Sequence, residues 1–365
     1  MRSYALVALL AGAAIATPVP QEIDWAAVDA LDPIPEPTIP IVDAAAAATT
    51  VTFSASAAAS SVASAVLANP TDTTPKMVKR VDDSGCSVQP GSSDTAANFL
   101  ANTDISAAAT SASTPQGWSL AYSNQPGSSQ GVYGYMGYSV LASYDVAGCT
   151  ASCDKIVGCS SVNIYFERDP SVSPTSTCSN PASQTVIKCV YYGGPIAAGS
   201  ATNTGQWQND FQVVIAGSNA YVNSSIATPA GYQNVVPLGN AAINAPNDCN
   251  GMNTYMGVKI FSTGAFDAGL CAAACSATSE YDRQHPPASG IPQTCQFFNT
   301  YVLYNGTQAV GQYCTMYNET WPAAYATNVG QWRGNDHFTI GYSYAFSNTT
   351  GGADVPVGCT NPAHP

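Results

Sequence analysis

Short runs of apolar and β-branched residues, separated by polar and Gly/Pro-rich stretches, predict strands in two separate parts of the chain. The six predicted strands are Val162–Phe166, Ile187–Tyr192, Phe211–Ile215, Phe297–Tyr304, Tyr313–Tyr317 and His337–Ile340. A helix is predicted ahead of each set of three, because Asp145 and Asp267 stand where helix N-cap residues belong. A Cys-x3-Cys pair follows each aspartate, so both cysteines of a pair face the same side of their helix. The pattern predicts an α+β fold class, in which each part packs one helix on a short-stranded antiparallel sheet.

The two parts repeat the same landmarks in the same order. Both contain Tyr-Met-Gly, Asp-x3-Cys-x3-Cys, Cys-x3-Asn-x-Tyr, a later single cysteine and Asn-x-Gly-Gln-Trp, running from Tyr135 to Trp207 and from Tyr255 to Trp332. Cys189 and Cys314 each lie fourteen residues before the asparagine of the last motif. This agreement predicts a tandem repeat of one module, with the differences in length confined to loops.

The first 80 residues differ in composition from the rest. Residues 1–16 carry an apolar run after Arg2 and end in small residues, which predicts a signal peptide. Residues 17–80 are rich in Ala, Ser and Pro, contain no cysteine and end at Lys79-Arg80, a dibasic pair of the kind that processing proteases cut. We expect a propeptide here, with an Ala/Ser-rich stalk that stays attached as the alternative. The other expected segments are a lead-in at 81–133, module 1 at 134–240 and module 2 at 241–365.

All 12 cysteines follow Arg80. An even count, a signal peptide and regular spacing predict a disulfide framework rather than thiol chemistry. The chain has only 3 histidines, none at ligand spacing from the cysteine pairs, so no metal or other cofactor is expected. No later apolar run reaches the roughly 20 residues of a membrane-spanning helix. We therefore expect an extracellular, secreted protein, either free or associated with the cell wall, without membrane insertion.

The chain is acidic, with a formal net charge of −13. After Arg80 there are 16 acidic and 6 basic residues, which leaves a net charge of about −10 and disfavours nucleic acid and anionic membrane as partners. Four Asn-x-Ser/Thr sequons predict a glycosylated surface. Their acceptors are Asn223, Asn305, Asn318 and Asn348.

No arrangement of residues predicts catalysis. The glutamates after Arg80 are Glu167, Glu280 and Glu319, and they do not fall at equivalent places of the two modules, whereas a glycosidase needs two carboxylates beside one bond. Glu167-Arg168-Asp169 is the densest polar cluster, and an ion pair at a strand end explains it better than a catalytic acid. His337 follows Asp336 but has no counterpart in module 1, and no Gly-x-Ser-x-Gly motif occurs. We expect no enzyme.

Binding is the remaining function, and Glu167, Asp169, Trp207 and Trp332 are its candidate residues. Rigid aromatic side chains are effective contact residues for sugars and for protein pockets. For the two tryptophans a second interpretation is favoured, in which each ring packs on the sheet of its own module. The inserted loops at 169–188 and 276–294 are then the better places for contacts with a partner.

The cysteine-bearing motifs resemble those of PAN/apple modules, and the whole chain resembles secreted ascomycete (fungal) proteins with two such modules. Residues 135–221 and 250–346 carry the resemblance, in the order helix Cys-x3-Cys, strand Cys-x3-Asn-x-Tyr and a later strand cysteine. The family's pattern implies the pairs Cys149–Cys189, Cys153–Cys159, Cys271–Cys314, Cys275–Cys295 and Cys249–Cys359. Cys86 and Cys178 are left to pair with each other, which departs from that pattern because Cys178 lies in an inserted loop.

The resemblance implies a binding or adhesion protein that recognises an extracellular polysaccharide or a glycoprotein, at the cell wall or in the extracellular matrix. Two alternatives stay open. One is a structural wall component without a discrete ligand, and the other is a carbohydrate-active enzyme.

Overall fold

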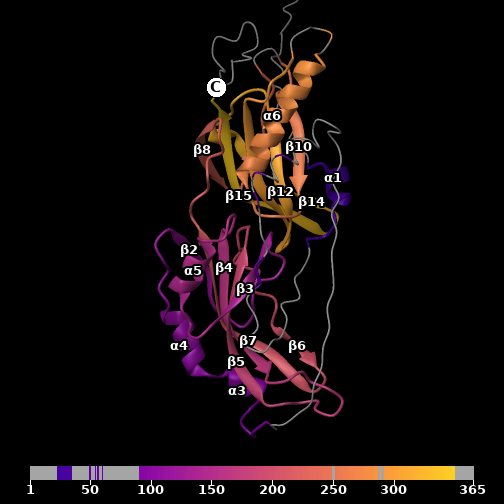
Figure 1. Ribbon diagram of the computed structural model, residues 1–365. Helices are drawn as coiled ribbons and strands as arrows, with labels where there is room; N and C mark the ends of the chain where they lie inside the picture. Colours follow the sequence, from indigo (N-terminus) through magenta and orange to yellow (C-terminus); the bar gives the residue numbers. More distant parts are fainter. Residues whose placement is uncertain are drawn as a thin grey trace, which may run out of the picture.

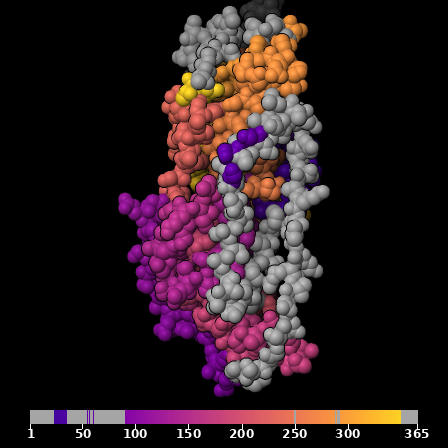
Figure 2. All heavy atoms as spheres, viewed as in Figure 1, coloured from indigo at the N-terminus to yellow at the C-terminus, as the bar shows by residue number. Residues whose placement is uncertain are grey.

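The computed structural model describes residues 23–34, 49–50, 54, 56, 60, 90–248, 251–286, 288 and 292–349. These residues form two large antiparallel sheets that lie one after the other along the long axis of the molecule (Figure 1). The residues of the two halves occupy its two ends (Figure 2). The expected signal peptide at 1–16, the Lys79-Arg80 site, Cys86, Cys249 and Cys359 lie outside the described residues.

The first sheet contains seven strands in the order β1-β3-β5-β4-β7-β2, with β6 paired to β7. The strands are β1 (Thr49–Thr50), β2 (Trp118–Gln125), β3 (Tyr135–Leu141), β4 (Ser161–Pro170), β5 (Ser183–Tyr192), β6 (Gly205–Gln208) and β7 (Phe211–Asn223). Three helices lie beside this sheet, α3 (Ala96–Leu100), α4 (Thr103–Ser111) and α5 (Val146–Cys153). Helices α3 and α4 contact β7, and α5 contacts β4. The segment expected as a lead-in thus supplies β2 and two helices to the first sheet.

The second sheet has the order β10-β12-β11-β15-β14, with β8 paired to β15. Its strands are β8 (Tyr232–Gly239), β10 (Tyr255–Phe261), β11 (Phe297–Asn305), β12 (Gln308–Tyr317), β14 (Gly330–Arg333) and β15 (Asp336–Asn348). A small two-stranded sheet joins β9 (Ala242–Ile243) to β13 (Ala326–Asn328), and the turn η1 (Ala323–Tyr325) precedes β13. Helix α6 (Ala268–Gln284) contacts β11, and α1 (Trp25–Asp29) lies beside β14 (Figure 1).

The two sheets have the same topology. In the order β3, β5, β4, β7, β2 and β6, the strands of the first sheet correspond to β10, β12, β11, β15, β8 and β14 of the second. In both, a short hairpin strand pairs with one end of a 13-residue strand, β7 or β15. The boundary between the halves precedes β8, because β8 pairs with β15 of the second sheet.

The helix that follows each Asp-x3-Cys motif begins where the sequence predicts. Asp145 caps α5 by accepting a hydrogen bond from the Gly148 N–H at 2.9 Å, and Asp267 caps α6 through the Gly269 N–H at 2.7 Å. These bonds satisfy backbone donors that the first helical turn leaves free.

Disulfide bonds join each of these helices to its sheet. The bonds are Cys149–Cys189, Cys153–Cys159, Cys271–Cys314 and Cys275–Cys295, the four pairs that the PAN/apple resemblance implies for these residues. Cys178 is also disulfide-bonded. Cys86, its expected partner, and the expected Cys249–Cys359 pair lie outside the described part of the chain.

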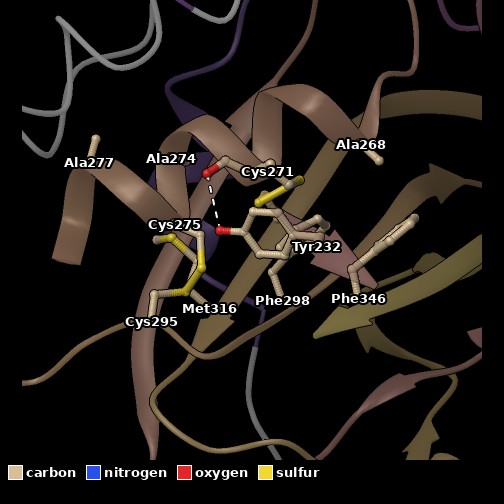
Figure 3. Close-up of a cluster of buried hydrophobic side chains, with 12 residues drawn as sticks. Tyr232, Ala268, Cys271, Ala274, Cys275, Ala277, Cys295, Phe298, Met316 and Phe346 are labelled. Carbon is tan, nitrogen blue, oxygen red and sulfur yellow. Dashed lines mark hydrogen bonds between the residues drawn. A yellow bond between two sulfur atoms is a disulfide. The ribbon is translucent and has the colours of Figure 1, made fainter. Parts of the chain in front are cut away.

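In the second half, the disulfides lie within the core itself. Figure 3 shows α6 above Phe298, Met316 and Phe346, with Tyr232 reaching up to the helix. The Tyr232 hydroxyl donates to the Ala272 carbonyl at 3.3 Å. Small residues on this side of α6, among them Ala268, Ala274 and Ala277, let the helix approach the sheet closely enough for both cysteine pairs to bond.

The predicted α+β fold class, with one helix on a short-stranded sheet in each module, is wrong. The structure is mainly antiparallel β, and its central strands are 9 to 13 residues long. Three short helices, α3, α4 and α5, lie beside the first sheet, and α6 and the five-residue α1 lie beside the second. The predicted runs are shorter than the strands because buried polar residues and register shifts interrupt the alternation of apolar and polar positions from which a strand is predicted. All ten residues of β4 are buried, including Asn163 and Glu167, so apolar and polar residues do not alternate along this strand.

The two halves contact each other through the ends of their sheets. Hydrogen bonds between described residues cross the boundary, among them those from Phe266 N to Gly193 O at 2.8 Å, from Ala309 N to Gly131 O at 2.8 Å and from the Tyr133 hydroxyl to Thr263 O at 3.0 Å. Tyr133 is buried in one cluster with Phe266, Val302 and Tyr304 of the second half. The halves therefore share a packed boundary.

Candidate binding site: two tryptophan hairpins

Each repeat ends in a hairpin that carries its Asn-x-Gly-Gln-Trp motif. Trp207 lies in β6 opposite Gln212, and Trp332 lies in β14 opposite His337. Both hairpins project from the ends of the long strands β7 and β15, and Figure 1 shows β6 and β14 at different levels of the molecule.

The first residues of the motif shape the hairpin. Gly205 and Gly330 have φ angles of +103° and +115°, and a Cβ atom on either would collide with the carbonyl of Val213 or Phe338 on the facing strand. Asn203 Oδ1 accepts a hydrogen bond from Gly205 N at 3.1 Å, and Asn328 Oδ1 accepts one from Gly330 N at 3.0 Å. The asparagine and glycine thus fix the entry into each hairpin strand.

Both tryptophan side chains are exposed to solvent. Trp207 is 66% exposed and Trp332 is 68% exposed. The interpretation favoured from the sequence, in which the rings pack on their own sheets, is therefore not what the structure shows. The Trp332 ring stacks on the His337 ring, with centroids 4.3 Å apart and planes at 10°. This stacking holds the second indole in place without burying it.

The surroundings of the two rings are polar. Exposed polar residues lie near each tryptophan in the sequence: Gln206, Asn209 and Asp210 near Trp207, and Asn335 and Asp336 near Trp332. A flat apolar ring beside amide and carboxylate groups matches the mixed apolar and hydroxyl surface of a sugar. The two sites can therefore offer stacking and hydrogen bonding together.

Glu167 and Asp169, the other predicted ligand-binding residues, lie inside the first half. Asp169 has 0% exposure, and both residues surround the ammonium of Lys188, which donates to Glu167 and lies 3.5 Å from Asp169. Burial and the charge of Glu167 raise the pKa of Asp169 to about 8. Although burial opposes it, the pKa of Lys188 is raised because the two carboxylates favour its charged form.

Arg168, between these two residues, points to the other face of the sheet. Its guanidinium pairs with Asp94 at 2.8 Å and lies 4.2 Å from the centroid of the Phe211 ring. The polar cluster of β4 therefore forms buried ion pairs, and the structure does not bring it together with Trp207 or with a surface cleft.

The remaining candidates are dispersed. Glu280 pairs with Arg283 at 2.9 Å on the solvent-exposed side of α6. Glu319 follows β12, and the His337 ring stacks on Trp332. The sequon asparagines Asn223, Asn305, Asn318 and Asn348 lie at or just beyond strand ends and are half-buried. Their glycosylation remains a prediction.

Two further observations bear on the kind of site. In the described residues no group of three or more His, Cys, Asp or Glu side chains could hold a metal ion. None of the described helices has the length and apolarity needed to cross a membrane.

Comparisons with known proteins add no relatives. No protein-family model, no curated protein and no solved structure matches this chain. The resemblance to PAN/apple modules and the ascomycete source therefore stay predictions, and the function rests on the geometry described above.

Proposed function

We propose that this protein is an extracellular, disulfide-stabilised binding protein that holds a neutral carbohydrate chain through Trp207 and Trp332. The observation that supports this most strongly is the repetition of one exposed indole at the same position of two equivalent hairpins. An exposed tryptophan has no role in the core of its own half, and a contact role explains why both hairpins present one.

A repeating polymer suits two identical sites. A polymer long enough to reach from one hairpin to the other contacts both rings, and its second contact then forms at a high effective concentration. Each site alone can then be weak while the whole chain is held firmly. A net charge of −13 opposes binding of acidic polysaccharides and favours a neutral one.

The disulfides are compatible with this location. Each half contains two of the four described disulfide bonds. Such bonds persist in oxidising, extracellular surroundings. A binding protein that works outside the cell gains resistance to unfolding from them.

Retention on insoluble glycans tests the proposal. The secreted full chain is incubated with β-glucan, chitin, mannan and cellulose, and bound protein is measured against concentration. We expect saturable binding to at least one of them, and the Trp207→Ala, Trp332→Ala double variant to bind at least about fivefold more weakly. The matched control is Met252→Ala, which truncates a side chain of 62% exposure away from the hairpins and should bind as wild type.

Three outcomes would contradict the proposal. Binding that the double variant retains in full would exclude the hairpins as the site. Retention only on whole cell walls would favour a structural component, and release of soluble sugars would indicate an enzyme.

A further inference from the structure

Residues 23–29 lie on the face of the second sheet that points away from α6, whereas Ile34 packs on a separate cluster with Val302 and Tyr304. Strand residues alternate between faces, so Phe298 and Cys314 face α6, whereas Tyr301 and Tyr313 face the opposite side. On that side Ile23, Trp25 and Val28 pack with a cluster of apolar residues from β11, β12 and β15. The cluster consists of Tyr301, Leu303, Tyr313, Phe338 and Ile340, and we call this surface the tyrosine face.

The contact of this N-terminal segment with the tyrosine face is specific. Ile23 is only 5% exposed, and the Trp25 ring meets the Phe338 ring edge-on with centroids 4.8 Å apart. Tyr301 and Tyr313 stack beneath with centroids 5.4 Å apart. The segment therefore inserts one aliphatic and one aromatic side chain into a preformed aromatic surface.

Polar groups at the rim of the tyrosine face fix the orientation of the segment. The Arg333 guanidinium pairs with both carboxylate oxygens of Asp29, at 2.6 Å for Oδ2, and lies 5.1 Å from the Trp25 ring centroid. Ile23 N donates to Gln331 Oε1 at 3.4 Å. Only 6 basic residues follow Arg80, and Arg333 is one of them. Its charged hydrogen bonds therefore favour a segment with an acidic group at the position of Asp29.

The segment leaves part of the tyrosine face unfilled. A cavity remains beneath Ile23 and Asp24, and its lining includes Tyr255, Tyr301 and Tyr313. The Tyr313 hydroxyl is buried at this place without a hydrogen-bond partner. Residues 23–29 therefore do not fill this surface completely.

The equivalent face of the first repeat has a different pair of residues at its centre. Tyr301 faces Tyr313 across β11 and β12, and the equivalent cross-strand pair of the first sheet is Tyr165 with Lys188. Leu303 likewise corresponds to the buried Glu167. The equivalent face of the first repeat also buries tyrosines, among them Tyr138 and Tyr165, so the second repeat differs there by having Tyr313 and Leu303 in place of the Lys188–Glu167 ion pair.

We propose that the tyrosine face is a binding site for a short peptide of apolar and acidic residues, which residues 23–34 occupy within the same chain. A five-residue helix such as α1 is too short to be stable alone, so its docking depends on the tether. The tether keeps the segment at an effective concentration on the order of millimolar. Cleavage after Arg80, which the sequence predicts, removes the tether and opens the tyrosine face to a similar peptide of another protein.

Peptide binding to an undocked full chain tests this proposal. The Trp25→Ala, Asp29→Asn double variant releases the segment from the tyrosine face, and a labelled synthetic peptide of sequence 23–34 is titrated into it. We expect saturable binding that is at least about tenfold weaker to the wild-type chain, where the site is occupied. A peptide with alanine in place of Trp25 should lose most of its affinity.

Two arginine substitutions in the undocked chain locate the site. Arg333→Gln should weaken peptide binding about twofold to fivefold, because it removes the partner of the peptide's acidic group. Arg283→Gln is the matched control, since it removes a solvent-exposed, ion-paired cation from α6 on the other side of the sheet, and should change nothing.

The proposal is overturned if the folded, undocked variant binds no peptide, if Arg333→Gln and Arg283→Gln behave alike, or if a neutral glycan occupies the tyrosine face instead. If the undocked variant does not fold, a protease site is inserted between residues 34 and 49 of the wild-type chain and cut after folding. Exchange of the cut segment with labelled peptide then supports the proposal, and permanent retention without exchange refutes it.

Discussion

Asn163 of β4 and Asn299 of β11 make the same three hydrogen bonds in the two halves of the protein. Each side chain is fully buried, accepts from a backbone N–H of a covering segment, and donates to a serine hydroxyl and a carbonyl of the neighbouring long strand. The partners at 2.8–2.9 Å are Ser129 N, Ser218 Oγ and Asn219 O for Asn163, and Ile243 N, Ser343 Oγ and Tyr344 O for Asn299. The Cys-x3-Asn-x-Tyr motif thus encodes a polar clamp between three segments.

Replacing either asparagine by leucine should destabilise its own half. The change leaves at least two buried polar groups without partners, at a cost of about 1–3 kcal/mol each. We expect a loss of roughly 2–5 kcal/mol in the free energy of unfolding, measured by urea denaturation. Asn98→Ala, at an exposed site in α3, is the control and should stay within about 0.5 kcal/mol of wild type. A similar small effect for Asn163→Leu would show that the clamp is dispensable.

The loss of stability on removing a disulfide should increase with the length of the loop that it closes. In the first half, Cys149–Cys189 spans 40 residues and Cys153–Cys159 spans 6, so loss of each bond is expected to cost about 4 and about 2 kcal/mol. In the second half the separations are 43 and 20, and the expected costs of about 4 and about 3 kcal/mol lie closer together. Thermal unfolding of the four double Cys→Ala variants checks this. A larger loss for Cys153/Cys159 than for Cys149/Cys189 would refute the loop-length account.

Stability should fall as the pH rises from about 4 to about 8. Burial and Glu167 raise the pKa of Asp169 from 3.8 to about 8, so the folded state keeps a proton that the unfolded state releases. This contribution is complete below pH 4 and is lost as the pH approaches 8, by an amount on the order of a few kcal/mol. The Asp169→Asn variant should therefore be more stable than wild type at pH 8 and closer to it at pH 4.

Denaturation midpoints at several pH values measure this difference. Asp154→Asn makes the same change of charge at the exposed end of α5 and serves as the control. A difference between Asp169→Asn and wild type that stays constant from pH 4 to pH 8 would contradict a protonated Asp169 in the folded protein.

The local starting points of the fold could be predicted from the sequence. Asp145 and Asp267 cap their helices as expected, because an N-cap depends on a few adjacent residues. The predicted apolar runs lie within strands β4, β5, β7, β11, β12 and β15. What the runs could not show is how far those strands extend. Glu167 and Asp169 are predicted at a strand end, whereas the structure buries them within β4, where they surround Lys188 of β5.

Two features of the candidate sites could not be predicted from the hydrophobic periodicity of the sequence. At Gly205 and Gly330 the positive φ angle interrupts the alternation of side chains between the two faces of the sheet. The sequence position of Trp207 and Trp332 therefore does not predict which face they are on. The docking of residues 23–34 involves contacts about 300 residues apart, such as Asp29 with Arg333, and no local pattern predicts those. The sequence indicates Trp207 and Trp332 as candidates, whereas no sequence pattern indicates the tyrosine face.

The number of sugar-binding sites per chain tests the central claim most directly. A short neutral oligosaccharide of the glycan that retains the protein is titrated by calorimetry into the wild-type chain, the Trp207→Ala and Trp332→Ala variants and the double variant. Because both rings are exposed, these substitutions should leave the unfolding free energy within about 0.5 kcal/mol of wild type. We predict two sites in the wild-type chain, one in each single variant and none in the double variant. An unchanged number of sites in the double variant would contradict the account.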